Sequence, residues 1–489
     1  MDEDFCPIPQ LEKHGEFLEK VVELMFKNVI FTTRQDKVLL WQNPDQLQQQ
    51  FDLSLKQNGE THEELINLLK NTIKFSVKTG HPYFINQLFS GLDPYGLAAQ
   101  WLTDSLNASA YTYEVAPVFT LMEKQIIKEV CRMIGPNWKD GLFCPGGSFA
   151  NGLAMNLARY QRYSKVKENG MFRLPHLIIF ASEECHYSIF KFAAFLGIGE
   201  ENVCRIMTDD IGRVICSDLE LKIEQTVKEG NIPILVIATL GTTVRGAFDP
   251  INEIADICTK YEMWLHIDAA WGGGLIFSQK HRAKLNGIER ADSMVINPHK
   301  LLAVPQQCSL LLVKDSDILY KCYSREAEYL FQKDKHYDIS YDLGDKYLQC
   351  GRKCDVFKFW FMWKAKGSSG FASHIDALMD IAEYFEKQVN HRSEFLLVSQ
   401  RQYMNVCFWY IPRYLRGKSN IAENFAQLQK VAPQIRAVMI QHGSVMLGYQ
   451  PLKIFPNFFR FVSQNSALNK TDVDFILDHI QEIGDAIFK

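Results

Sequence analysis

Side chains capable of covalent and acid–base chemistry follow several short apolar runs in this chain. Lys300 comes just after the run MVI at residues 294–296, Asp268 ends the run WLHID, and His186 follows the run LIIFAS. A lysine amine can condense with a carbonyl group, and a carboxylate can keep a nitrogen heterocycle protonated. An imidazole can stack on a flat ring. Together these three groups indicate chemistry on a bound aromatic carbonyl compound.

A glycine-rich turn adds a place for a phosphate. FCPGGSFANG, starting at Phe143, puts Gly147 and Ser148 ahead of the helical stretch LAMNLARYQRY. Backbone N–H groups at such a turn and at a helix N-terminus suit a phosphate. With the lysine, the carboxylate and the imidazole, this turn fits pyridoxal 5'-phosphate. Each feature alone has an ordinary explanation, such as a solvated lysine or a helix-capping aspartate, but their combination on successive strands favours the cofactor.

The elements that must position these groups form an α/β pattern. Apolar, β-rich runs at 177–182, 234–239, 264–269, 294–297 and 309–313 predict strands. Amphipathic stretches at 218–230 and 251–261 lie between some of them and predict helices. Nearly all-apolar strands separated by helices indicate a largely parallel sheet covered on both faces. Ligands bind outside the carboxyl ends of such strands, where the reactive side chains lie.

The chain divides into three predicted parts. Residues 1–80 contain amphipathic helices without a core of their own, so we expect them to pack on another domain or subunit. Residues 81–345 would form the large cofactor-binding domain, and residues 346–489 a smaller C-terminal domain. That domain ends in an amphipathic helix, which Thr471 could cap.

Composition narrows the class of protein. The 489 residues are 47% apolar and 22% charged with a net charge of -4, which is ordinary for a soluble globular protein and argues against nucleic-acid or anionic-membrane partners. No signal peptide or spanning apolar stretch is visible. The twelve cysteines include no CxxC; a metal or disulfide use of Cys350 and Cys354 stays open, but free thiols are favoured. We therefore expect a cytoplasmic protein and no metal site.

Several longer motifs resemble the pyridoxal-phosphate-dependent group II decarboxylases of the acidic-amino-acid branch. They include NPHK at 297–300, HIDAAWGGG from His266, GTTVRGAFDP from Gly241 and DKHYDISYDLGDKYLQCGR from Asp334. The resemblance runs from about residue 80 to the C-terminus. That branch contains glutamate, cysteine sulfinate and animal aspartate 1-decarboxylases. The resemblance implies the type I aminotransferase-like fold with a mostly parallel seven-stranded sheet and an α+β C-terminal domain. It also implies a homodimer with active sites at the subunit interface, clamped by the N-terminal helices.

The resemblance assigns roles to residues around the cofactor. Lys300 would be the Schiff-base lysine, and Asp268 would pair with the pyridine nitrogen. His186 would stack on one ring face and Ala270 would pack on the other, with Thr242 near the ring hydroxyl and Asp268. The residues that it places around the phosphate are Gly147, Ser148, Asn297 and His299.

Two further positions follow from the same resemblance. Tyr337 matches a mobile-loop tyrosine that delivers a proton after CO2 leaves and reaches the neighbouring subunit's site. The segment FANG departs from the family, because relatives more often have serine where this chain has Ala150, and Phe149 is bulkier than a common isoleucine. We expect the turn to survive this change, with altered surroundings for the cofactor.

Substrate choice depends on Arg460 in the strand-like segment PNFFRFVSQN, where it shares a face with Phe458 and Val462. A guanidinium among phenyl rings needs a partner, either a protein carboxylate or a substrate carboxylate. In the family the matching arginine holds the side-chain acid, helped by a glutamine at the position of Gln87. Phe89 stands where glutamate decarboxylases typically have serine, and it would shorten the cavity.

We therefore expect L-aspartate or L-cysteine sulfinate as substrate, with β-alanine or hypotaurine as product and glutamate poor. Aspartate is slightly favoured because DPYGLAAQWLTDSLN resembles the arthropod-type aspartate enzymes. Alternatives are a glutamate decarboxylase that makes GABA, an aminotransferase or other lyase on the same fold, an aromatic-amino-acid decarboxylase, and a catalytically silent dimerisation partner.

Overall fold

A seven-stranded sheet forms the centre of the computed structural model, which describes residues 11–89, 91–417, 421–453 and 455–489. The strand order is β1-β7-β6-β5-β4-β2-β3, with β2 to β6 parallel and β7 antiparallel to both of its neighbours. The bounds are β1 (Asp140–Cys144), β2 (Leu177–Ser182), β3 (Val203–Ile206), β4 (Ile232–Thr239), β5 (Trp264–Ala269), β6 (Ser293–Ile296) and β7 (Ser309–Val313). The predicted α/β class with a mostly parallel seven-stranded sheet is confirmed.

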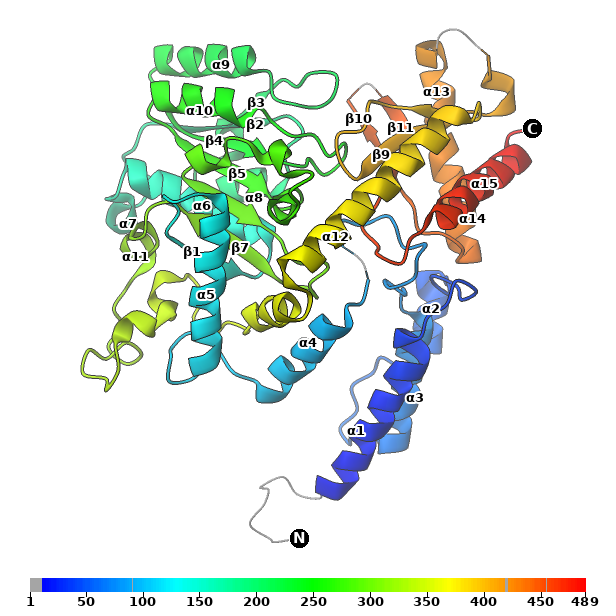
Figure 1. The fold of residues 1–489 in the computed structure, drawn as a ribbon, viewed down its shortest axis with the longest axis horizontal. Helices are drawn as coiled ribbons and strands as arrows, with labels where there is room; N and C mark the ends of the chain where they lie inside the picture. The colour runs from blue at the N-terminus through cyan, green and yellow to red at the C-terminus, as the bar shows by residue number, and fades with distance from the viewer. Residues whose placement is uncertain (1–10, 90, 418–420, 454) are drawn as a thin grey trace.

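Helices cover both faces of this sheet (Figure 1). α6 (Gly147–Arg162) packs on the face that carries Val295 and Leu311, whereas α9 (Cys216–Lys228) and α10 (Ile251–Lys260) share a cluster with Met294 and Leu312. Alternate residues of one strand thus enter opposite layers, as the period of two requires. Burial on both faces explains why these strands are almost continuously apolar.

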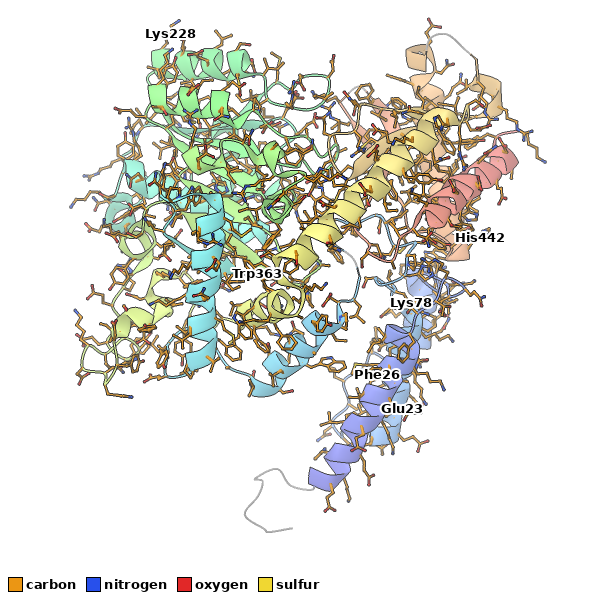
Figure 2. All side chains as sticks on the ribbon, in the orientation of Figure 1. Glu23, Phe26, Lys78, Lys228, Trp363 and His442 are labelled. Carbon is orange, nitrogen blue, oxygen red and sulfur yellow. The ribbon has the colours of Figure 1, made fainter. Side chains whose placement is uncertain are left out.

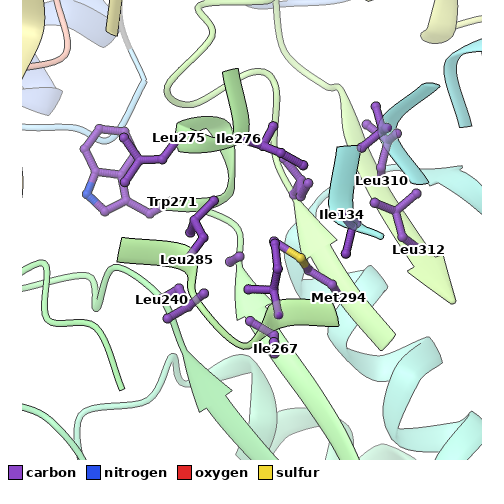
Figure 3. Close-up of a cluster of buried hydrophobic side chains, with 14 of the residues drawn as sticks. Ile134, Leu240, Ile267, Trp271, Leu275, Ile276, Leu285, Met294, Leu310 and Leu312 are labelled. Atoms are coloured by element: carbon purple, nitrogen blue, oxygen red, sulfur yellow. The ribbon is translucent and has the colours of Figure 1, made fainter. Parts of the chain in front are cut away.

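The core holds the strand ends firmly in place. Figure 3 shows Ile267 and Met294, from the neighbouring strands β5 and β6, near Trp271 and Leu275 from the segment that follows β5. All four are at most 2% exposed. The segment directly after β5 is therefore fixed by its own buried side chains, which matters because Asp268 lies at the end of that strand.

A second, antiparallel sheet forms the small C-terminal unit, in the order β10-β11-β9-β8. Its strands are β8 (Phe395–Leu397), β9 (Asn405–Tyr410), β10 (Gly448–Leu452) and β11 (Phe455–Val462). The long helix α12 (Val356–His391), kinked at Gly367, connects the two sheets (Figure 1). The helices beside the small sheet are α13 (Phe425–Leu428), α14 (Val431–His442) and α15 (Lys470–Ile487).

The N-terminal helices project from the rest of the molecule (Figure 1). α1 (Leu11–Met25) and α3 (His62–Phe75) lie side by side, and no residue of α3 is buried. Figure 2 shows Glu23 on α1 and Phe26 at the start of the short π-helix that follows it (Phe26–Ile30), and Phe26 is 40% exposed. The pair lacks a core of its own, as expected. The division at residues 80 and 345 stays a prediction. The segment after α3 pairs with the segment just before β10 through an isolated bridge between Phe84 and Met446.

The other α-helices have the bounds that follow. They are α2 (Pro44–Gln50), α4 (Pro94–Leu106), α5 (Pro117–Ile134), α7 (Val166–Asn169), α8 (Ser188–Phe195) and α11 (Ile318–Tyr323). Across the parts of the chain that the structure describes, no helix is both long and apolar enough to cross a membrane. The predicted cap at Thr471 is wrong, because α15 begins at Lys470 and Thr471 lies inside its first turn. Asn469 caps the helix through a capping box with Asp472.

Candidate active site

A cavity of about 510 Å³ opens at the carboxyl ends of β4, β5 and β6. Eight of the residues predicted to surround a cofactor line it: Gly147, Ser148, His186, Asp268, Ala270, Asn297, His299 and Lys300. They come from four separate segments of the chain. The structure therefore brings together the amine, the carboxylate, the imidazole and the glycine-rich turn that the sequence had suggested.

Lys300 lies in the turn that follows β6. Its backbone N–H donates to the Asn297 carbonyl at 2.9 Å, and its own carbonyl accepts from the Gln464 side chain. Burial lowers the pKa of the Lys300 amine; Asp268 opposes this shift and the charge of Arg460 adds to it. A lowered pKa leaves more of the amine neutral, which is the form that attacks a carbonyl.

Asp268 and His186 lie on two sides of the cavity with defined hydrogen bonds. One Asp268 oxygen accepts from the Asn151 amide at 2.8 Å, and the other accepts from the Ala270 backbone N–H at 3.1 Å. His186 Nδ1 lies 2.9 Å from the Ser188 hydroxyl and accepts from the Ser188 backbone N–H at 3.3 Å. Burial lowers the pKa of His186. The imidazole is thus neutral at neutral pH and offers a flat, uncharged face.

The glycine-rich turn forms a close-fitting cradle at the start of α6. A Cβ on Gly147 would lie 2.6 Å from the Asn297 amide nitrogen, so the helix start can approach that side chain only without one. The first N–H groups of a helix have no intrahelical partners, and the helix dipole attracts an anion there. A phosphate cradle, an amine with a lowered pKa and a carboxylate in one cavity fit the phosphate, aldehyde and pyridine nitrogen of pyridoxal 5'-phosphate.

Two positions near the cofactor differ from expectation. The Thr242 hydroxyl is fully buried and accepts from the Ala247 N–H at 3.0 Å, within the turn after β4, and Thr242 is not among the cavity-lining residues. Thr239, at the end of β4, lines the cavity instead, and its buried hydroxyl has no hydrogen-bond partner. Sequence reasoning also missed Asn151. Its spacing of four residues from Gly147 on one helix was the signal that could have found it.

Arg460 lies on β11, beside the cavity. Its terminal nitrogens donate to the carbonyl oxygens of Thr243, at 2.9 Å, and Asn86, at 2.7 Å, while its buried Nε has no partner. Among the described residues, no carboxylate pairs with it. Gln87 is exposed, and Phe89 is half-buried with its ring 5.9 Å from that of Phe84. The residues that line the cavity do not include Arg460, Gln87 or Phe89. Arg460 reaches the cavity wall through its hydrogen bond to Thr243, which does line the cavity.

Tyr337 lies away from its own chain's cavity. Its hydroxyl donates to Asp342 at 2.9 Å, and its ring lies 5.1 Å from that of Tyr113. Lys335 pairs with the same Asp342 at 2.9 Å. The structure therefore does not bring Tyr337 to the Lys300 of the same chain. Within the described ranges, no group of three or more His, Cys, Asp or Glu side chains is arranged to hold a metal ion.

Comparisons with known proteins agree with this geometry. The model of the pyridoxal-dependent decarboxylase conserved domain matches residues 44–411. The chain is 49% identical over 454 residues to cysteine sulfinic acid decarboxylase of Homo sapiens (93% of this chain, 92% of that protein). It is 47% identical over 481 residues to acidic amino acid decarboxylase GADL1 of Xenopus tropicalis (98% and 94%). The crystal structure of mouse CSAD is similar, with a TM-score of 0.95 and 46% identity over 97% of this chain and 99% of that one. The chain therefore belongs to the pyridoxal-dependent decarboxylase family.

Proposed function

We propose that this pyridoxal-phosphate-dependent decarboxylase removes the α-carboxylate of L-aspartate, L-cysteine sulfinate or both, giving β-alanine or hypotaurine and CO2. The observation that carries the choice of an acidic substrate is Arg460, a largely buried cation whose only described partners are neutral carbonyl oxygens. A substrate carboxylate would supply the missing charge. The names of the similar human and Xenopus proteins support the same substrate class.

Each cavity residue has a task in this proposal. Gly147, Ser148, Asn297 and His299 would hold the phosphate, and His186 and Ala270 would flank the ring. A carboxylate beside the ring nitrogen favours its protonated form, and Asp268 would supply that carboxylate. Bound through Lys300, pyridoxal 5'-phosphate supplies an electron sink for the pair left behind when CO2 departs.

Substrate orientation comes from the opposite end of the amino acid. Arg460, with Gln87, binds the distal acid and so directs the bond to the α-carboxylate. Phe89 shortens the space for that acid, which favours four-carbon aspartate and its sulfinate analogue over glutamate. A methylene alone discriminates by about 1–3 kcal/mol, and a steric clash can add to that.

Tyr337 completes the site from the partner subunit and donates the proton that replaces the lost carboxylate. Two observations support a homodimer. Tyr337 is not at its own chain's cavity, and large apolar side chains are exposed on the N-terminal helices and on α4 and α5. They include Leu18, Val22, Leu102, Leu106, Val118 and Leu121. Exposed apolar surface of this extent marks an interaction site.

The cytoplasmic location also stays a proposal. Cys350 is exposed and Cys354 is buried, and neither forms a disulfide. Free thiols such as these are typical of a reducing compartment.

A side-by-side assay tests the substrate assignment. CO2 release is measured from aspartate, cysteine sulfinate, cysteic acid and glutamate with the wild type and with Phe89→Ser. We expect aspartate and cysteine sulfinate to be fastest, and Phe89→Ser to raise the rate with glutamate relative to aspartate. Faster turnover of glutamate by the wild type would refute the role of Phe89. Keto-acid formation without CO2 would show an aminotransferase instead.

A catalytically silent dimerisation partner is the remaining candidate. The presence of Lys300, Asp268 and His186 around one cavity is against it. A purified protein without a visible absorbance band and without CO2 release from any of the four acids would favour it.

A further inference from the structure

A continuous chain of hydrogen bonds runs behind Asp268. Trp264 Nε1 donates to the Ser293 hydroxyl at 2.8 Å, and that hydroxyl lies 2.9 Å from His266 Nδ1. His266 Nε2 lies 3.1 Å from the Asn151 carbonyl oxygen, and the Asn151 amide donates to Asp268 at 2.8 Å. Ser293, His266 and Asn151 are at most 1% exposed. The chain runs from β5 to β6 and back to β5, then crosses to α6 and returns to β5.

The carboxylate end of this chain and a neutral His266 fix the direction of its bonds. An indole N–H can only donate, and an ionised carboxylate can only accept. The Asn151 amide nitrogen therefore faces Asp268, its carbonyl oxygen accepts from His266 Nε2, and the Ser293 hydroxyl donates to the unprotonated Nδ1. The opposite orientation of the Asn151 amide would place its oxygen against the Asp268 carboxylate. Burial lowers the pKa of His266 to about 4, so the ring is neutral and its Nδ1 can accept.

The second N–H of Asn151 reaches the other ring-contacting group. Its amide nitrogen also donates to the Ser188 hydroxyl at 3.2 Å, and that hydroxyl lies 2.9 Å from His186 Nδ1. The Ser188 backbone N–H points to the same nitrogen. His186 Nδ1 is therefore an acceptor, which leaves the proton on Nε2. One amide thus bonds Asp268 directly and His186 through Ser188.

We propose that Asn151 is a positioning residue that orients both Asp268 and His186 toward the cofactor ring, and that Ser293 and His266 hold its amide in the one orientation that serves both. The inference concerns cofactor binding and rests on the family assignment, not on which acid is the substrate. Buried networks with every member satisfied hold a single arrangement, so a break at one end is felt at the other.

The test uses variants at both ends of the chain and a matched buried hydroxyl outside it. Asn151→Leu removes both N–H donors at nearly constant volume, and Ser293→Ala removes only the remote hydroxyl. Thr120→Val is the control, because Thr120 is 2% exposed and its hydroxyl donates only to the Ala116 carbonyl at 2.8 Å. For each protein we measure the dissociation constant for pyridoxal 5'-phosphate added to the cofactor-free enzyme. We also measure the visible circular dichroism of the bound cofactor and the melting temperature of the cofactor-free enzyme.

We expect Asn151→Leu to weaken cofactor binding by about 10- to 100-fold, because a hydrogen bond to a charged group is lost. The circular dichroism per bound cofactor should also fall, because the ring is less firmly oriented. Ser293→Ala should weaken binding by roughly three- to tenfold through the same chain. Thr120→Val should bind like the wild type.

Lower melting temperatures with unchanged dissociation constants and dichroism would show that the chain only stabilises the fold, and would overturn the proposal. If Asn151→Leu does not fold, Ser293→Ala decides the question, and wild-type values for it would also overturn the proposal. None of these readouts uses a substrate, so a failed substrate assignment would leave them unchanged.

Discussion

At the residue scale, the choice of an acidic substrate depends on the charge of Arg460, which no described carboxylate balances. Arg460 donates to the neutral carbonyl oxygens of Thr243 and Asn86, and its Nε has no partner. Leaving a buried cation unpaired is costly, so such sites are typical of ligand binding rather than of structural support. At Lys300, in contrast, burial lowers the pKa of the amine while nearby Asp268 opposes that shift.

Replacing Arg460 tests whether its charge binds the distal acid of the substrate. Arg460→Met should lower kcat/KM for aspartate and cysteine sulfinate by about 30-fold or more, because a charge-assisted bond to the distal acid is lost. Steady-state kinetics measure this effect. The control is Arg436→Met. Arg436 lies on the neighbouring helix α14 and also donates to a backbone carbonyl, that of Leu447, at 3.1 Å. Equal losses in the two variants would contradict a binding role for Arg460.

The buried His266 predicts a pH dependence of stability. Its pKa is about 4 in the folded protein and near 6.5 when unfolded, so the unfolded chain binds the proton first as the pH falls. Stability is therefore complete above pH 6.5 and is lost as the pH falls toward 4. Between pH 7.5 and pH 5 we expect this histidine to lower the free energy of unfolding by about 2 kcal/mol.

Urea unfolding at both pH values, at one protein concentration, measures this loss. His266→Gln, which can donate to Asn151 and accept from Ser293, should show a pH-dependent loss smaller by that amount. An equal loss in both proteins would contradict the assignment.

Sequence reasoning found the residues whose place is set by the strand just before them. Asp268 ends β5 and Lys300 follows β6, so their arrival at one cavity could be predicted from strand order alone. Thr242 was expected near the cofactor, but its position depends on how one turn folds back to Ala247. The contact of Asn151 with Asp268 depends on how α6 docks, which the helical spacing from Gly147 alone does not give. The cap at Thr471 was predicted from residue type alone, and only the geometry of the helix start shows that Asn469 caps α15 instead.

At the element scale, the position of α6 decides how the cavity is built, because it carries both the phosphate turn and Asn151. The helix approaches α8 closely at Gly152, where a Cβ would overlap the Phe192 ring, and Phe192 itself lines the cavity. Sequence periodicity predicted α9 and α10 within two residues, but not the short outer strands β1 and β3. Those strands lie at the two edges of the sheet, where apolar patterning is weakest.

Gly152→Ala tests this close approach. The added methyl group must displace the Phe192 ring, so we expect the free energy of unfolding to fall by about 1–3 kcal/mol. Urea denaturation measures the change. Gly15→Ala, in α1 with nothing within 4 Å of the new Cβ, should raise helix stability slightly instead. A neutral Gly152→Ala variant would mean that α6 and α8 are not packed as described.

At the scale of the whole molecule, we propose that Tyr337 acts at the site of a second subunit. Its hydroxyl is bonded to Asp342 and does not line the cavity of its own chain. The N-terminal helices carry exposed apolar side chains and project from the body (Figure 1). Both features follow if each subunit completes the site of the other.

Mixed dimers of two impaired variants test this arrangement. Lys300→Ala lacks the covalent lysine, and Tyr337→Phe should release CO2 but divert part of the product to aldehyde. If Tyr337 acts across the interface, a mixed dimer contains one site with both residues intact. An equal mixture should then recover roughly a quarter of the wild-type rate of amine formation, once the decarboxylation by Tyr337→Phe alone is subtracted. No recovery after confirmed subunit exchange would place Tyr337 within its own subunit's site.

The central claim is that the Lys300 amine is the point at which pyridoxal 5'-phosphate joins the protein. Borohydride reduction of the purified enzyme, followed by peptide mass spectrometry, measures this directly. We expect one modified peptide, with the phosphopyridoxyl mass on Lys300, and none from Lys300→Ala. Modification of a different lysine, or an unmodified Lys300 in yellow enzyme, would contradict it.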